Sequence, residues 1–274
     1  MAMRPMVLGY SASPALSLDA AVAARRRFGD RARSLGLSIC FMNDRHALAT
    51  TGSTPMAPRA VHGRWRVIHF DGLLHRRTSL LMYGVKPEVM SDAEAMEHLL
   101  NDHGPASLAW PIGDWSVAAV SSDGLLLACD YFGNRALFYH LDDEGAVVWS
   151  DQNWVLAEYG ECGDVLDAVY LAGALYFLPP VHRTAFRDVR PIPPGHAGVL
   201  GTAGFDVHPY WVPQRRQIHL ASPREYAQTF VELLRDGVRD RLATPGHKWV
   251  EISGGVDSAR LPHASAHVFK RIPA

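Results

Sequence analysis

The stretch Trp115-Ser116-Val117-Ala118-Ala119-Val120, with Ser122-Asp123-Gly124 and Leu125-Leu126-Leu127-Ala128-Cys129-Asp130 behind it, decides the fold. Two apolar runs joined by a short turn that contains Asp and Gly are typical of a β-hairpin. Two more strand-like runs follow at 136–141 and 146–150, and residues that favour turns separate them. Four short strands with tight connections predict an antiparallel meander in the middle of the chain.

Helices and further strands are predicted on both sides of this meander. Ser91-Asp92-Ala93-Glu94 has the pattern of a capping box and predicts the start of a helix. Asp71-Gly72 comes after an alternating strand-like run and predicts a turn. The predicted helices span 15–35, 91–102 and 164–177, and the predicted strands span 37–42, 65–70, 198–200 and 207–211.

A second part of the chain begins after a linker at 213–221. Ser222-Pro223-Arg224-Glu225 predicts another capping box, with Pro at the first helical position. One face of the helix that follows carries the apolar residues Tyr226, Phe230, Leu233, Leu234, Val238 and Leu242. Pro245-Gly246 ends this helix, and 249–252 predicts a buried strand. This order of helix and strand is typical of the opening of a parallel α/β domain.

A glycine-containing motif, Ser253-Gly254-Gly255-Val256-Asp257-Ser258, directly follows that strand. Two glycines at a strand end let backbone N–H groups turn toward an anion. Ser253 and Ser258 add hydroxyl donors, and Asp257 is a candidate Mg²⁺ ligand. The pattern indicates a pyrophosphate-binding loop, although a simple Gly/Ser turn has the same composition.

Composition excludes several classes of function. The 274 residues have a net charge of −1 and are 48% hydrophobic. We therefore expect no binding to nucleic acid and none to a membrane. The arginine pairs and runs, such as Arg76-Arg77, are interpreted as solvated faces. Three widely spaced cysteines and an N-terminus without a continuous apolar run predict a cytoplasmic protein with no disulfide framework.

Several motifs, in their order along the chain, resemble those of the asparagine synthetase family. They are Gly113-Asp114-Trp115-Ser116-Val117-Ala118, the segment 128–139, Thr184-Ala185-Phe186, the segment 190–196 that ends in Pro193-Pro194-Gly195-His196, and Tyr210-Trp211. The resemblance covers residues 65–258 and ends at the SGGVDS motif, which resembles the signature of ATP-pyrophosphatases.

The resemblance implies an α+β protein with two parts. Residues 1–212 would form a four-layer αββα class II glutamine amidotransferase-like domain of the N-terminal nucleophile (Ntn) type. Residues 222–274 would form the first part of an α/β ATP-pyrophosphatase domain. It also implies ATP and Mg²⁺ as cofactors, with Asp257 as the metal ligand. The residues that would hold ATP or pyrophosphate are Ser253, Gly254, Gly255, Asp257 and Ser258.

The chain departs from the family in its glutaminase half. The family uses a cysteine at the mature N-terminus, whereas Ala2 follows the initiator here and the first cysteine is Cys40. The glutamine-holding N-G-E turn of the family appears as Asp71-Gly72-Leu73. Asp92 matches a position that contacts the glutamine amine, although a negative charge at a helix N-terminus explains it equally well. We interpret Asp71, Gly72 and Asp92 as a vestigial glutamine site and assign no catalytic residue.

The expected function is that of an ATP-dependent amide-forming ligase that acts through an acyl-adenylate and has no working glutaminase. Glutamine-dependent asparagine synthetase is the family's default activity. β-Lactam synthetases and lasso-peptide cyclases fit the missing N-terminal cysteine better, because an amine within their own small-molecule or peptide substrate attacks the adenylate and no ammonia from glutamine is needed. Only 16 residues follow Ser258, which predicts a truncation or a frameshift. A non-catalytic module that binds a peptide or a partner protein is the alternative.

Overall fold

The computed structural model describes residues 6–51, 64–122, 124–160, 163, 165–243, 251, 253–256 and 258. The chain divides into two compact units, Met1–Val212 and Pro213–Ala274, and each is described by itself. The strands of the first unit are β1 (Val7–Ser11), β2 (Ser38–Met42), β3 (His46–Thr50), β4 (Arg66–His75), β5 (Ile112–Ser121), β6 (Gly124–Cys129), β7 (Phe138–Leu141), β8 (Val147–Ser150), β9 (Arg190–Pro191), β10 (His196–Gly201) and β11 (Gly204–Pro209). Its helices are α1 (Leu18–Ser34), α2 (Asp92–His103), α3 (Asn153–Tyr159) and α4 (Ala168–Leu175), with 3₁₀ turns at Arg77–Tyr83 and Pro105–Ala109.

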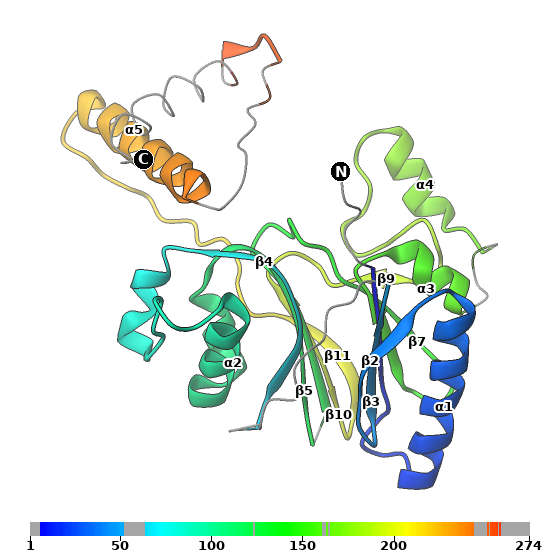
Figure 1. Ribbon diagram of the computed structural model, residues 1–274. Coiled ribbons are helices and arrows are strands. Elements are labelled where there is room, and N and C mark those ends of the chain that lie inside the picture. Colours follow the sequence, from blue (N-terminus) through cyan, green and yellow to red (C-terminus); the bar gives the residue numbers. More distant parts are fainter. Residues whose placement is uncertain are drawn as a thin grey trace. The chain divides into compact units, whose positions relative to one another are not determined.

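The first unit is a four-layer αββα sandwich, as predicted (Figure 1). One sheet has the order β2-β3-β1-β8-β7-β9 and the other has the order β11-β10-β6-β5-β4. Both sheets are antiparallel throughout. Three buried apolar clusters fill the gaps between the layers, one under α1, one under α2 and one between the sheets.

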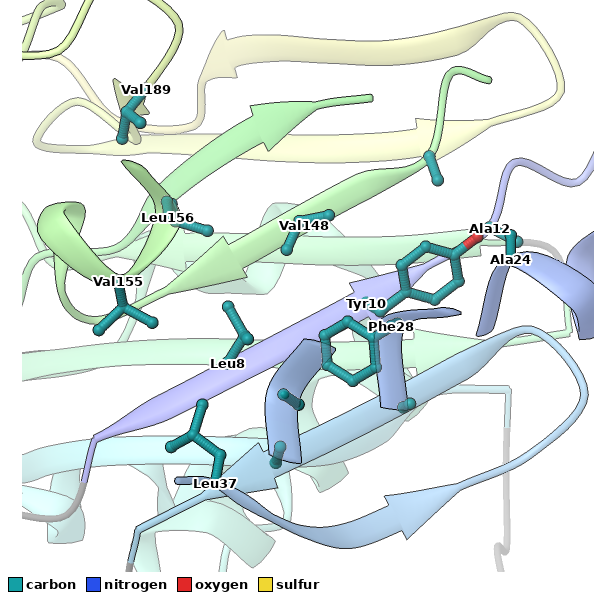
Figure 2. Packing of buried hydrophobic residues seen from close by; sticks show 14 of the residues in the cluster. Leu8, Tyr10, Ala12, Ala24, Phe28, Leu37, Val148, Val155, Leu156 and Val189 are labelled. Carbon is teal, nitrogen blue, oxygen red and sulfur yellow. The ribbon is translucent and has the colours of Figure 1, made fainter. Parts of the chain in front are cut away.

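Helix α1 shows how the sequence produces the outer layer. Ser17 caps it by accepting a hydrogen bond from the Ala20 N–H at 3.3 Å, which satisfies one of the free donors of the first turn. Alanines on the inward face allow close approach to the sheet, and Phe28 fills the remaining space. Figure 2 shows the Phe28 ring beside that of Tyr10, and the two ring centroids lie 5.4 Å apart.

The predicted single meander is wrong, because its two hairpins lie in different sheets. The β5–β6 hairpin belongs to the sheet under α2, whereas β7–β8 belongs to the sheet under α1. The chain leaves the first sheet at Asp130, whose buried carboxylate accepts the backbone N–H groups of Trp115 at 3.2 Å and Phe132 at 2.8 Å. Local patterns predicted each strand correctly, but sheet membership is decided by this crossover.

The predicted turn at Asp71-Gly72 is also wrong. Both residues lie inside the ten-residue strand β4, opposite Ser116 and Trp115 of β5. Gly72 has φ +118°, and a Cβ atom placed on it would lie 1.9 Å from the Asp114 carbonyl oxygen. Glycine is therefore needed here for the close approach of two strands rather than for a turn.

A buried histidine joins the two sheets. His46 in β3 has its Nδ1 2.9 Å from the Ser11 hydroxyl and its Nε2 3.1 Å from the Ser121 carbonyl oxygen of the opposite sheet. Because a carbonyl only accepts, Nε2 carries the proton and Nδ1 accepts from Ser11. Burial disfavours the charged imidazolium and lowers the pKa of His46 to about 4.

The second unit contains helix α5 (Pro223–Leu242), which begins where the sequence predicts. Ser222 accepts the Glu225 N–H at 3.3 Å, as in a capping box. The reciprocal bond differs, because the Glu225 carboxylate accepts the Ala221 N–H at 3.0 Å. The strand predicted at 249–252 lies outside the described residues except for Glu251.

None of the helices in the described part of the chain combines the length and the apolar character that spanning a membrane requires.

Candidate functional site

Polar side chains gather along β4 and β5 near the N-terminus of α2. We call this group the polar cluster; its members are Asp71, His75, Arg77, Asp92, Asp114, Asn134 and Arg135. It contains two of the three residues predicted to be a vestigial glutamine site, and Gly72 lies between them in the chain. The acids and bases of the cluster are paired with one another, as the following contacts show.

Asp92 opens helix α2 and is held from two sides. Its Oδ2 accepts the Leu74 N–H of β4 at 2.9 Å, and its Oδ1 lies 3.2 Å from the Arg77 Nε. Arg77 also donates to the Met90 carbonyl. The side chains of Asp92 and Arg77 are only 16% and 24% exposed. The prediction that Arg76-Arg77 is a solvated face is therefore wrong for Arg77.

Asp71 and Asp114 have partners from the crossover loop between β6 and β7. Asp71 forms an ion pair with Arg135 at 3.6 Å. Asp114 accepts from the Asn134 amide at 2.8 Å and lies 3.5 Å from the Nε2 of the buried His75. These contacts connect the edge strand β4 and its neighbour β5 to the loop that leads into the other sheet.

The described thiols are poor nucleophiles. Cys129 is fully buried between the sheets, and burial raises its pKa to about 12. Cys40 is half-buried in β2 and its pKa is also raised by burial. Because the thiolate is the reactive form, neither residue is suited to attack an amide. Ala2 and Cys162 lie outside the described residues.

The motif residues that suggested a family are joined by backbone contacts. The Gly195 N–H donates to the Asp130 carbonyl at 2.9 Å, and the Tyr210 N–H donates to the Gly195 carbonyl at 3.0 Å. The Tyr210 hydroxyl donates to the Cys129 carbonyl at 2.6 Å. Trp211 stacks on Tyr131 with ring centroids 4.6 Å apart. Three distant segments therefore meet at the crossover, where they stabilise the fold.

The loop at 253–258 in the second unit has an open geometry. The hydroxyls of Ser253 and Ser258 lie 3.1 Å apart, and the Ser253 N–H donates to the Ser258 hydroxyl at 3.2 Å. The Ser258 hydroxyl also contacts the Gly255 carbonyl at 3.1 Å. Gly254 has φ +83° with open space where a Cβ would be. Asp257, the expected Mg²⁺ ligand, lies outside the described residues.

The family of the chain follows from a match to a family model. A model described as "Glutamine amidotransferase domain" matches residues 45–211, more than half of the 274 residues. The chain belongs to the glutamine amidotransferase domain family. The match covers every strand from β3 to β11, together with all members of the polar cluster.

Solved structures of low identity are also similar to the chain. They include a glutamine phosphoribosylpyrophosphate amidotransferase from B. subtilis complexed with ADP and GMP, with 12% identity, a TM-score of 0.46 and coverage of 95% of this chain and 64% of that one. An allosteric regulatory enzyme of purine biosynthesis has 13% identity, a TM-score of 0.45 and coverage of 95% and 63%. A glutamine aminotransferase class-II domain protein from Silicibacter pomeroyi has 13% identity, a TM-score of 0.37 and coverage of 75% and 98%.

The chain thus spans less than two thirds of the length of the first two of these proteins. Because all three TM-scores lie below 0.5, they add nothing to the family assignment. No curated protein sequence matches the chain.

Sequence reasoning missed Arg77 and Arg135, the cations that pair with Asp92 and Asp71. Arg135 stood within a quoted motif, but its pairing depends on the crossover that brings residue 135 to β4. Arg77 lies 15 residues before Asp92, and the intervening 3₁₀ turn brings it back to the start of α2. Nothing in the local sequence around Asp71 or Asp92 indicates which cation pairs with it.

Proposed function

We propose that this chain carries the amidotransferase-like domain and the nucleotide loop of an ATP-dependent amide-forming ligase of the asparagine synthetase family, and that it does not hydrolyse glutamine. The observation that carries the ligase part is the pair of serine hydroxyls in the 253–258 loop. They lie 3.1 Å apart beside a left-handed Gly254 with open space above it. Two hydroxyls at this spacing suit the oxygens of a phosphate group.

The chemistry requires no ammonia from glutamine. A carboxylate of the substrate attacks the α-phosphate of ATP, which forms an acyl-adenylate and releases pyrophosphate. An amine then attacks the acyl carbon, and AMP leaves as the amide forms. The loop would hold the pyrophosphate through Ser253, Gly254, Gly255 and Ser258, and Asp257 would hold Mg²⁺ beside it.

The loss of glutaminase activity is supported by the polar cluster. Asp92, the residue expected to bind the glutamine amine, is already held by Arg77 and by the Leu74 N–H. Asp71 is paired with Arg135. A glutamine ammonium group would have to displace these partners, and the described thiols have raised pKa values. An amine within the substrate, as in lasso-peptide cyclases and β-lactam synthetases, fits this arrangement better than free ammonia.

A calorimetric titration of the full chain with ATP and magnesium chloride tests the ligase part. We expect binding that weakens about tenfold or more in Ser258→Ala. Ser34→Ala is the matched control, because the exposed Ser34 hydroxyl also donates to a carbonyl three residues earlier, at 2.7 Å. No binding of Mg-ATP by the unaltered chain would overturn the proposal.

Glutamate release from glutamine tests the other part independently. We expect a rate equal to that of a blank without protein. Release above this blank, with Mg-ATP binding retained, would leave the ligase assignment in place and contradict the loss of the glutaminase.

A non-catalytic binding module is the second candidate, and one observation favours it. Four consecutive large apolar residues, 175–178, are each at least 79% exposed. A surface of this kind is typical of a protein-binding site. A chain that fails to bind Mg-ATP but still associates with a partner would support this candidate.

A further inference from the structure

Strand β4 is an edge strand of its sheet, and helix α2 packs along it (Figure 1). An edge strand presents main-chain N–H and C=O groups that its own sheet does not pair. These outward groups belong to alternate residues of β4, because the residues between them form the hydrogen-bonded pairs with β5. The partners of the outward groups decide whether this edge can accept another strand.

The contacts of Leu74 and Trp115 show which residues of β4 point outward. The Leu74 N–H donates to the Asp92 side chain of α2, so Leu74 points away from β5. Gly72 lies opposite Trp115 of β5, and the N–H and C=O of Trp115 bond on the side away from β4, beyond the end of β6. Because the pattern alternates, the main-chain groups of Phe70 and Gly72 also lie on the outer edge.

Side chains of α2 pair with the outward groups toward both ends of β4. Asn101 accepts the Trp65 N–H at 2.7 Å and donates to the Trp65 carbonyl at 2.8 Å. Glu97 accepts the Val67 N–H at 2.8 Å. Together with the bond to Leu74, these contacts make the helix a substitute for a neighbouring strand at these positions.

A gap in this cover remains at Phe70 and Gly72. In the part of the chain that the structure describes, no group outside β5 bonds to their N–H or C=O groups. Ala93 lies four residues before Glu97 and eight before Asn101, on the same face of α2, but its methyl group cannot form a hydrogen bond. We call the outward main-chain groups of Phe70 and Gly72 the edge window.

The edge window is accessible and has the spacing of a strand. Phe70 and Gly72 are half-buried and the Leu73 between Gly72 and Leu74 is exposed, whereas Trp65 and Leu74 at the covered positions are buried. Alternate residues of a strand lie about 7 Å apart, and each of the two presents one donor and one acceptor. An extended peptide presents the same groups at the same spacing. A single amino acid is too short to bond to both residues.

We propose that the edge window binds an extended, uncharged segment of a peptide, which adds to β4 as a further strand. An uncharged segment fits, because the carboxylates of Asp71 and Asp92 already pair with Arg135 and Arg77. A second copy of this chain fits poorly, because side chains of α2 cover β4 on both sides of the window and leave only two residues to pair. The inference does not depend on the proposed ligase activity.

An NMR titration of the full chain, without ATP, tests the proposal. The probe is a capped five-residue peptide of alternating threonine and valine, which has no charge and favours an extended backbone. We expect saturable binding, with the backbone amide signals of Phe70 and Gly72 among the most shifted. The same peptide with all its backbone amides N-methylated keeps its side chains but has no N–H donors. It should bind at least about tenfold more weakly.

Ala93→Gln should close the edge window from the protein side. Glutamine can accept an N–H and donate to a carbonyl, as Asn101 does for Trp65. The dissociation constant of the peptide should rise about tenfold or more, whereas the free energy of unfolding should stay equal or rise. Ala23→Gln, at an exposed position of α1, is the matched control and should leave the dissociation constant unchanged.

Three outcomes would overturn the proposal. One is a titration in which the amide signals of Phe70 and Gly72 do not shift. Another is equal binding of the N-methylated peptide to the unaltered chain, or of the original peptide to Ala93→Gln. The third is a shift of the same two signals by L-glutamine as large as that by the peptide, which would assign the edge window to a free amino acid.

Discussion

The polar cluster on β4 and β5 and the 253–258 loop both contain polar side chains, but these side chains differ in their partners and in their exposure to solvent. In the cluster, the carboxylates of Asp71, Asp92 and Asp114 pair with side chains of the same unit and are at most 28% exposed. In the loop, the described hydroxyls of Ser253 and Ser258 bond each other and the loop backbone, and the residues around them are largely exposed. On our proposal, the cluster serves stability, whereas the loop has groups that can bind a ligand.

Two glycines provide the sharpest contrast between these regions. Gly72→Ala should lower the free energy of unfolding by at least about 3 kcal/mol, because its Cβ would lie 1.9 Å from the Asp114 carbonyl oxygen at φ +118°. Gly254→Ala should cost only about 1 kcal/mol, because its left-handed φ is strained but open space surrounds the position. Denaturant unfolding of both variants checks this, and equal losses would contradict the contrast.

Acid should weaken the first unit through His46. Its pKa is about 4 in the folded protein against about 6.5 in the unfolded chain, so the unfolded state binds the proton more tightly. Stability is therefore full above pH 6.5 and falls as the pH drops toward 4, by on the order of 3 kcal/mol.

Unfolding of the wild type and of His46→Gln across this pH range measures the contribution of His46 to the pH dependence of stability. Glutamine does not titrate, so the variant should be less stable at neutral pH but lose less stability on acidification. Parallel pH profiles would show that His46 does not carry this dependence.

Asp92→Ala should lower the free energy of unfolding by about 2 kcal/mol, because it removes the carboxylate that pairs with the Arg77 Nε and accepts the Leu74 N–H. Asp143→Ala, at an exposed turn between β7 and β8, is the control and should change stability by less than about 0.5 kcal/mol. If Asp92 were instead kept for a ligand, its removal would leave stability unchanged or raise it.

The serines of the loop should show the opposite behaviour. Ser258→Ala should change the free energy of unfolding by less than about 0.5 kcal/mol, because its hydrogen bonds are exposed to water. Its effect should appear in Mg-ATP affinity instead. A large loss of stability in this variant would show that the loop, like the polar cluster, serves to stabilise the fold.

Local patterns in the sequence predicted many of the helices and strands, although not β1, β3 and α3, and they predicted strand partners less well. The capping box of Ser91 and Glu94 is present as predicted, because capping depends on residues three apart. The meander and the Asp71-Gly72 turn were wrong, because sheet membership and strand length depend on contacts of Asp130 and Asp114 that no local pattern encodes. The ion pairs of the polar cluster were missed for the same reason.

The resemblance was recognised from residues that stabilise the fold rather than from residues that react. Asp130, Gly195 and Tyr210 bond one another at the crossover between the sheets. Motifs of this kind identify a family whether or not its chemistry is retained. Glutamine hydrolysis and ATP binding must therefore be tested at the polar cluster and at the 253–258 loop.

The most direct test of the account is a pair of calorimetric titrations on one preparation of the full chain, first with L-glutamine and then with Mg-ATP. The account predicts no heat of binding with glutamine, and saturable binding of Mg-ATP that Ser258→Ala weakens. Binding of glutamine without binding of Mg-ATP would contradict it, because the polar cluster would then be the working site and the loop a relic.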